Sequence, residues 1–121
     1  MGQPSSAALD LALTSGTLST GDLSATGSST GVVFLGGFNF TLTGTWVGVV
    51  ALERSFDGGT TWVNANTDSI GTPSAYTGNC SVIVWEIESM VFYRATFTRT
   101  SGTVTYRLSQ TSPMIIGGAW H

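Results

Sequence analysis

The side chains that can perform covalent chemistry are few in this sequence. His121, at the last position, is the only histidine in 121 residues. A hydrolase needs a nucleophile with a neighbouring base, or two carboxylates that flank the bond to be cleaved. With a single terminal histidine, we do not expect a nucleophile paired with a histidine base.

Four acidic residues are candidates for the two carboxylates of a glycosidase: Glu53, Asp57, Glu86 and Glu88. Asp57 lies in a glycine-rich turn, where its oxygens are needed by backbone amides. Glu86 and Glu88 are two residues apart, so in a strand they lie on the same face. We therefore expect solvated or ion-paired carboxylates, with Arg94 or Arg107 as partners.

The single cysteine, Cys80, excludes an intrachain disulfide. It precedes an apolar run at residues 82–85 and has no histidine nearby, which favours a buried thiol over a nucleophile. The sequence also lacks the cysteine and histidine spacing of a zinc site. We therefore expect no catalytic residue, no cofactor and no metal.

Aromatic residues offer another kind of site, because flat rings can stack on sugars. Trp62, Trp85 and Tyr76 are the candidates for such a platform. Tryptophans inside alternating strands are more often part of the core, which we expect for Trp46, Trp62 and Trp85. Trp120 lies in a glycine-rich tail and is instead expected at an interface.

Residues 54–62 read RSFDGGTTW and have the composition of a tight turn. Asp57 can accept hydrogen bonds from amides across the turn, and the two glycines can adopt positive φ. Trp62 can pack beneath it. The residues of this turn motif are Ser55, Asp57, Gly58, Gly59 and Trp62.

Charge is scarce: 9% of the residues are charged, none is lysine, and the net charge is −3. Nucleic-acid binding depends on many Lys and Arg contacts to phosphate, so we expect no nucleic-acid partner. The N-terminus lacks the features of a signal peptide, and no apolar run has the length of a membrane helix. We expect synthesis in a cytoplasm and no membrane association.

Alternating apolar and polar residues predict strands throughout the ordered part of the chain. Phe38, Phe40 and Leu42 share one face of a strand, and Gly48 marks either a bulge or a close backbone approach in the next stretch. Ser101-Gly102 predicts a turn between two further strands. No window has helical periodicity, so the expected fold is all-β, an antiparallel sandwich of six to eight short strands, immunoglobulin-like or jelly-roll-like.

The chain divides by composition into three parts. Residues 1–30 are rich in Ser, Thr and Gly and predict an extended arm, 31–112 predict the sandwich, and 113–121 predict an apolar docking tail. The candidate interface residues are Leu9, Leu11, Leu13, Leu18, Met114, Ile115, Ile116 and Trp120. We expect the arm to add a strand to a neighbour's sheet, and a chain without residues 1–23 to fold but not bind.

The string from Ser55 to Trp62 resembles the Asp-box, the repeated hairpin motif of sialidase propellers. A propeller needs several four-stranded blades, and this chain has one copy of the motif in 121 residues. The resemblance therefore implies a structural turn and no sialidase.

A second resemblance covers more of the chain. The segment FNFTLTGTWVGVVALERSFDGGTTWVNA, within about residues 34–65, is similar to small structural proteins of tailed bacteriophages, as is YRATFTRTSGTVTYRLSQ near the end. This resemblance implies a non-enzymatic virion component, and we favour a decoration or cement protein on the capsid surface. The expected partners are the major capsid protein and other copies of this chain, as a trimer or other symmetric oligomer. A tail, baseplate or head-fibre position and a carbohydrate-binding module are the alternatives.

Overall fold

The computed structural model describes residues 17–67 and 70–111, and in these ranges every regular element is a strand. The strands are β1 (Thr17–Leu23), β2 (Gly27–Ser28), β3 (Val32–Val33), β4 (Gly36–Ser55), β5 (Val63–Asn64), β6 (Cys80–Glu86) and β7 (Phe92–Gln110). All pairings are antiparallel and belong to one sheet. The all-β antiparallel prediction is confirmed.

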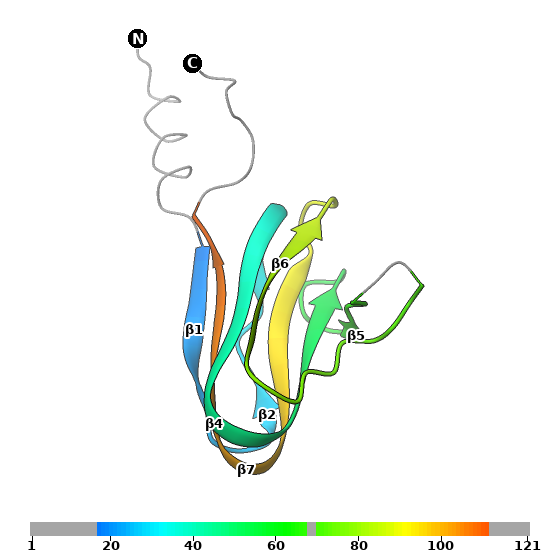
Figure 1. Ribbon diagram of the computed structural model, residues 1–121. Helices are drawn as coiled ribbons and strands as arrows, with labels where there is room; N and C mark the ends of the chain where they lie inside the picture. The colour runs from blue at the N-terminus through cyan, green and yellow to red at the C-terminus, as the bar shows by residue number, and fades with distance from the viewer. Residues whose placement is uncertain (1–16, 68–69, 112–121) are drawn as a thin grey trace.

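Two long strands form the frame of the sheet. β4 has 20 residues and β7 has 19, and they pair from Asn39 opposite Ser109 to Ser55 opposite Phe92. Both strands bend midway, so that the sheet folds over itself (Figure 1). One layer contains β1 and β6 beside the bent pair, and the other contains β2, β3 and β5. The fold is thus sandwich-like, but its two layers are halves of one continuous sheet.

The bend is made by glycines on both long strands. The register shifts between Val47 and Gly48, where the expected bulge is found, and Gly48 has φ of 149°. Gly102 has φ of 79°, and a Cβ there would lie 2.3 Å from the carbonyl oxygen of Thr45. The turn predicted at Ser101-Gly102 was wrong, because β7 continues through these residues and bends with β4.

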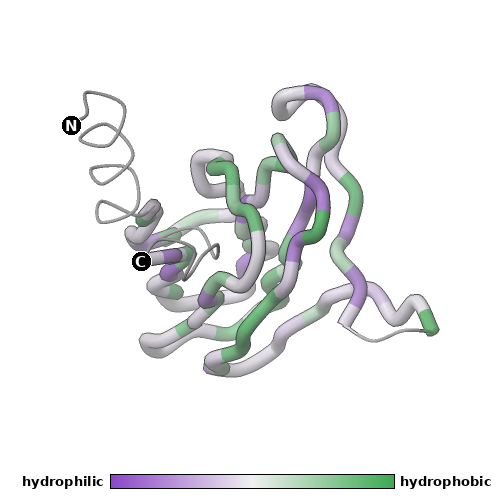
Figure 2. The backbone as a smooth tube through the Cα atoms, turned by 90° about the horizontal axis from the view of Figure 1, so that it is seen from above, coloured by the Kyte–Doolittle hydropathy of each residue, from purple (hydrophilic) through white to green (hydrophobic). Residues whose placement is uncertain are grey.

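The core lies between the two layers. Alternate residues of the long strands point inward, and polar and apolar positions alternate along the chain (Figure 2). Phe38 of one layer contacts Tyr93 of the other, with ring centroids 4.6 Å apart. The buried hydrophobic residues are Phe34, Phe38, Phe40, Leu42, Val50, Leu52, Ala65, Val91, Tyr93, Ala95, Phe97, Val104, Tyr106 and Leu108.

Part of the arm predicted at residues 1–30 belongs to the sheet. Residues 17–23 form β1, which pairs with residues 104–110 of β7, and Gly27–Ser28 pairs with the same strand. Residues 17–28 therefore belong to the sheet domain as two strands and the turn between them, and a deletion of residues 1–23 would remove β1. Leu18 lies on β1 with 55% of its surface exposed. The remaining interface candidates, Leu9, Leu11, Leu13, Met114, Ile115, Ile116 and Trp120, lie outside the described residues.

Candidate functional site

The turn after β4 is organised by Asp57. Its Oδ1 accepts hydrogen bonds from the amides of Thr60 at 3.1 Å and Thr61 at 2.8 Å, and from the hydroxyl of Ser55 at 2.8 Å. The Ser55 hydroxyl also accepts the amide of Gly59 at 2.8 Å. The amide of Thr61, followed by the Ser55 hydroxyl, lowers the pKa of Asp57 to about 2. Asp57 thus holds the turn as a carboxylate and has no proton to give at neutral pH.

Trp62 completes this turn from the side. Its indole nitrogen donates to the carbonyl oxygen of Gly59 at 2.9 Å, and Gly58 and Gly59 both have positive φ. The guanidinium of Arg94 lies 4.2 Å from the centroid of the Trp62 ring and donates to Glu53 at 2.7 Å. The turn, the tryptophan and the Glu53–Arg94 ion pair therefore form one structural unit on the outer face of the sheet.

Glu86 is a second carboxylate that is fully engaged. Its side chain is buried and accepts hydrogen bonds from Arg54, from the hydroxyl of Tyr93 at 2.7 Å and from the amide of Glu88 at 2.9 Å. Burial alone raises the pKa of Glu86, but these hydrogen bonds outweigh burial and lower the pKa below its ordinary value. Glu88 lies exposed beyond the end of β6, so the expectation that it shares a strand face with Glu86 was wrong.

The ion pairs partly match those expected from the sequence. Arg94 pairs with Glu53, whereas Glu86 pairs with Arg54, a partner that was not expected. Cys80 is half-buried, and burial raises the pKa of its thiol, which disfavours the nucleophilic thiolate. Within residues 17–67 and 70–111, no three His, Cys, Asp or Glu residues are grouped closely enough to hold a metal ion.

The tryptophans divide into packed and exposed positions. Trp46 and Trp62 are half-buried, and Trp46 packs edge-on against Phe97 at 5.6 Å. The core positions expected for Trp62 and Trp85 were wrong, since Trp62 is half-buried against Arg94 on an outer face and 65% of Trp85 is exposed. Val84 beside it faces the core, and alternation along β6 turns Trp85 outward.

The three residues proposed for a sugar platform do not lie on one surface. Trp85 projects from the outer face of the layer that contains β6. Trp62 stacks on Arg94, whose neighbours Tyr93 and Ala95 face the core, so Trp62 lies on the outer face of the other layer. Tyr76 lies between the layers and contacts Phe40, with ring centroids 5.3 Å apart.

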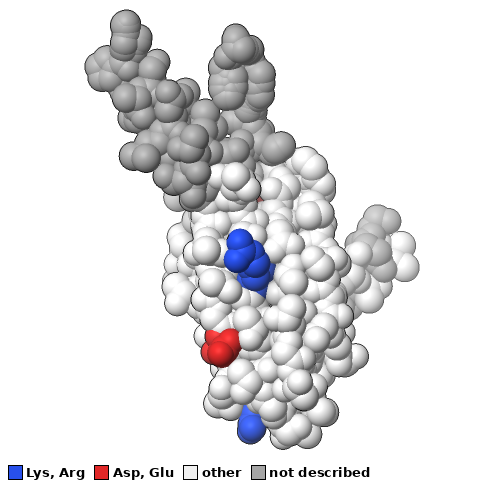
Figure 3. All heavy atoms as spheres, turned by 60° about the vertical axis from the view of Figure 1, so that its left-hand side comes forward, with Lys and Arg blue, Asp and Glu red and all other residues white. Residues whose placement is uncertain are grey.

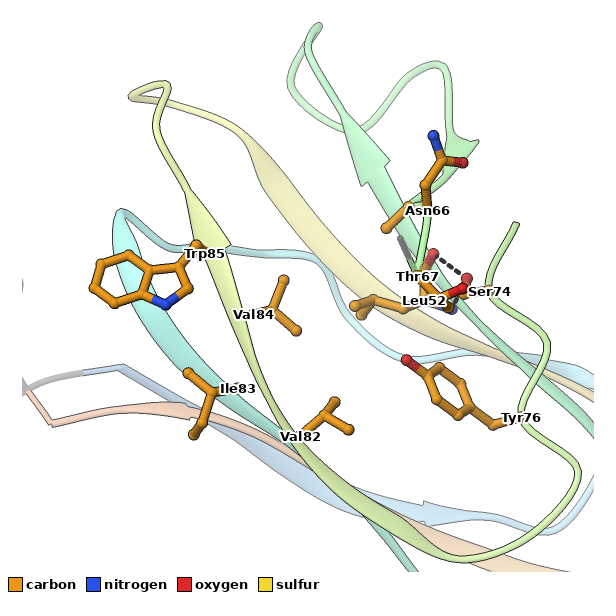
Figure 4. A pocket seen from close by; sticks show the side chains of 10 residues that line it. Leu52, Asn66, Thr67, Ser74, Tyr76, Val82, Ile83, Val84 and Trp85 are labelled. Atoms are coloured by element: carbon orange, nitrogen blue, oxygen red, sulfur yellow. Dashed lines mark hydrogen bonds between the residues drawn. The ribbon is translucent and has the colours of Figure 1, made fainter. Parts of the chain in front are cut away.

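A groove opens beside β6, between the two layers. Figure 4 shows Val82 and Val84 of β6 pointing toward Leu52 and Tyr76, whereas Ile83 and Trp85 point away. The cavity between them has a volume of about 410 Å³, and a second cavity of about 330 Å³ continues it toward Arg54 and Glu86. The two share Ala65, Asn66, Val84 and Trp85.

On the side of the groove opposite β6, the side chain of Ser74 makes the hydrogen bonds to Leu52 that a paired strand would otherwise make. The hydroxyl of Ser74 donates to the carbonyl oxygen of Leu52 at 2.8 Å and accepts the Leu52 amide at 2.9 Å. Two residues later, Tyr76 pairs with Val50 through both backbone hydrogen bonds. Residues 74–76 therefore form the edge of one layer and β6 forms the edge of the other.

The outer face of β6 is apolar and exposed. Ile83 is 68% exposed and Trp85 65%, Ile87 just beyond the end of β6 is 94% exposed, and we name these three residues the β6 surface. The indole of Trp85 lies over Gly37 of the neighbouring strand, close enough that a Cβ there would be 3.3 Å from it. Exposed apolar residues in contact with an open edge are typical of protein interfaces.

Charge is sparse near this surface. Among the described residues that line the groove, Arg54 and Glu86 alone are charged, and they pair with each other. The face of the molecule that carries β1 also shows few charged side chains (Figure 3). The β6 surface therefore offers apolar side chains and backbone groups for contact, with few charges whose interactions salt would screen.

The sequence predicts the strand at this site but not its position at the edge of the sheet. The run Ser81–Glu86 has the residue types of a strand, and its near-continuous apolar character suggests burial on both faces. Which strand lies at an edge depends on the order of pairing, and among the strands that the structure describes β6 pairs with β4 alone.

In the described ranges, no helix is long and apolar enough to cross a membrane. No protein-family model, no curated protein and no solved structure matches this chain.

Proposed function

We propose that this chain is a non-enzymatic assembly protein that decorates the capsid of a tailed bacteriophage and bridges neighbouring capsomers. The observation that supports this best is the β6 surface, where Ile83, Trp85 and Ile87 are exposed beside an open strand edge. The carboxylates Glu53, Asp57 and Glu86, which are the best candidates for chemistry, are all engaged in structural hydrogen bonds. The resemblance of residues 34–65 to virion proteins is the reason for proposing a phage particle.

The binding energy in such a role comes from apolar contact area. Burial contributes about 25 cal/mol per Å² before the costs of association, and stable interfaces bury about 1,200–2,000 Å² in total. A small domain with 9% charged residues has little charge to desolvate when such a surface is covered. Many copies on a shell, each adding one junction, then resist internal pressure together.

Binding to purified shells that lack this chain tests the proposal. Wild-type protein is expected to sediment with shells, and Ile83→Arg is expected to weaken binding at least about tenfold, because it places a charge on the apolar β6 surface. The matched control is Val47→Arg at the bend, where 57% of the valine is exposed, and this variant is expected to bind as the wild type does.

Crosslinking on intact particles locates the protein. Carboxylate-reactive reagents are required because the chain has no lysine, and Asp22 and Glu88 are exposed reporters. Crosslinks to the major capsid protein support decoration. Crosslinks confined to tail, baseplate or fibre proteins move the proposed location within the virion, and absence of the chain from particles contradicts the proposal.

A further inference from the structure

We propose that the groove beside β6 receives residues 9–13 of a second copy of this chain as an added strand. This inference rests on the proposed assembly function, and it names the segment and the receiving edge through which copies join. Its test uses the purified chain alone, so that its failure is distinguishable from a failure to bind capsids.

The groove has the properties of a vacant strand position. β6 pairs with β4 on one side, and among the described residues no backbone hydrogen bond joins its other side to residues 65–76 across the groove. In an antiparallel pair, alternate N–H and C=O groups of an edge strand point away from its partner. β6 thus presents a row of backbone donors and acceptors next to an apolar cavity.

Native edge strands usually carry features that prevent further pairing. Lysines, prolines, bulges and inward-pointing charges are the common ones. Residues 80–86 contain neither lysine nor proline, their register with β4 is continuous, and their single charge, on Glu86, is neutralised by Arg54. The edge is therefore left open to another strand.

The segment at residues 9–13 matches the groove in pattern and length. Leu9, Leu11 and Leu13 alternate with Asp10 and Ala12. With its leucines directed inward against Leu52, Tyr76 and Val84, such a strand covers the cavity and leaves Asp10 in water. Five residues span about 17 Å, which fits within the roughly 23 Å of the seven residues of β6.

The distance across the sheet favours residues 9–13 of a second copy over those of the same chain as the strand in the groove. The strand order in this layer is β1, β7, β4, β6, so the groove lies four strand positions from β1. At about 4.8 Å per position the crossing measures about 19 Å, which takes about six extended residues. A segment ending at Thr17 would use residues 11–16 for this crossing and leave only Leu9 of the three leucines for the groove.

The direction of the strands also favours a second copy as the source of the added strand. Thr17 pairs with Gln110, whose side chain donates to the carbonyl oxygen of Gly37, and Gly37 pairs with Trp85. The chain therefore enters β1 at the end of the layer that contains Trp85. If residues 9–13 occupied the groove of their own chain, they would have to run parallel to β6. A second copy can approach antiparallel, which is the more stable pairing. If each copy passes its segment to the next, the contact is head-to-tail, which gives a ring where the rotation between copies closes and an open filament where it does not.

Engineered disulfides test the pairing directly. In chains carrying Cys80→Ser, Ile83→Cys is placed on one chain, and Asp10→Cys or Ala12→Cys on another. These side chains face outward together in the proposed pairing. After mixing through unfolding and refolding, disulfides between the two chains are expected at one of the two positions. Leu18→Cys on β1 is the control for random oxidation.

A chain that carries both cysteines shows whether the groove binds the segment of another copy or the segment of its own chain. Disulfides between chains support the proposal, whereas a disulfide within one chain at dilute concentration overturns it in favour of self-insertion. Absence of any disulfide above the Leu18→Cys control also overturns it.

Measurement of mass in solution gives an independent readout. The full chain is expected to form an oligomer, and serines in place of Leu9, Leu11 and Leu13 are expected to reduce it to a monomer. Ile83→Arg, whose side chain points away from the groove, and Val47→Ser at the bend are both expected to leave the oligomer unchanged. A wild-type monomer contradicts the inference. An oligomer that survives the leucine changes but not Ile83→Arg also contradicts it, since β6 would then pair with β6 of another copy.

Discussion

The hydroxyl of Tyr93 donates a 2.7 Å hydrogen bond to Oε1 of Glu86, and this bond joins the two layers of the folded sheet. Glu86 ends β6 in one layer, while Tyr93 lies on β7 in the other. Arg54, on the same layer as Tyr93, donates to the same oxygen. The three residues close one end of the groove with charge-assisted hydrogen bonds.

Replacing Glu86 by glutamine should destabilise the domain by about 2 kcal/mol, because Arg54 loses its counter-charge and a buried hydrogen-bond network is left partly unsatisfied. Urea denaturation at pH 7 measures the loss. Glu88→Gln changes an exposed carboxylate two residues away and should shift the free energy of unfolding by less than about 0.5 kcal/mol. Equal effects of the two changes would contradict a role for the buried network.

The contribution of Glu86 should depend on pH in a defined direction. Its pKa in the folded state lies below the ordinary value of 4.5, because the hydrogen bonds from Tyr93, Glu88 and Arg54 outweigh burial. A depressed pKa contributes stability above the unfolded-state pKa, and this contribution is lost as the pH falls through the folded-state pKa. The difference in stability between wild type and Glu86→Gln should therefore be constant from pH 7 to 5 and shrink below about pH 4.5. A difference that grows in acid contradicts this assignment.

Asp57→Asn should lower the melting temperature at neutral pH, because the amides of Thr60 and Thr61 lose a charged acceptor. The pKa of Asp57 is about 2, below the ordinary value of 3.8, so its contribution is present above about pH 4 and declines toward pH 2. An NMR titration of the Asp57 carboxyl resonance should give a midpoint near 2. Asp22→Asn is the control, since Asp22 accepts a hydrogen bond from the hydroxyl of Thr105 outside any turn. An ordinary midpoint for Asp57 would contradict the observed hydrogen bonding.

Local features of this fold could be predicted from the sequence. Alternation placed Phe38, Phe40 and Leu42 correctly on an inward face, since each side-chain direction in a strand depends only on position. The turn at residues 55–62 was equally accessible, because its hydrogen bonds connect residues at most four positions apart.

Features that depend on long-range pairing could not be predicted in this way. Ser101-Gly102 has the composition of a hairpin turn, yet Gly102 meets Thr45 and Trp46 across the sheet and serves a bend. Trp85 is exposed because the opposite face of β6, with Val82 and Val84, meets the other layer, and the pairing of Glu86 with Arg54 joins residues 32 positions apart. No pattern within a short window carries that information.

Gly102→Ala should destabilise the domain by at least about 2 kcal/mol or prevent folding. The new Cβ would lie 2.3 Å from the Thr45 carbonyl oxygen, and φ of 79° is strained for alanine. Gly78→Ala is the matched control, because nothing lies within 4 Å of its Cβ position. Denaturation curves of both variants measure the difference. A stable Gly102→Ala protein would contradict the observed bend.

Trp85→Ala should weaken binding to shells strongly and lower the stability of the domain only slightly. With 65% of the residue exposed, its loss should lower the free energy of unfolding by less than about 1 kcal/mol. Trp46→Ala should cost about 3 kcal/mol, because this indole packs against Phe97 and donates to Asn79 at 2.7 Å. An aromatic anchor at the centre of an interface is often worth about 2 kcal/mol, so Trp85→Ala should weaken binding to shells about thirtyfold. Thermal unfolding and sedimentation with shells measure the two effects, and a Trp85→Ala protein that binds as tightly as the wild type would exclude the β6 surface from the interface.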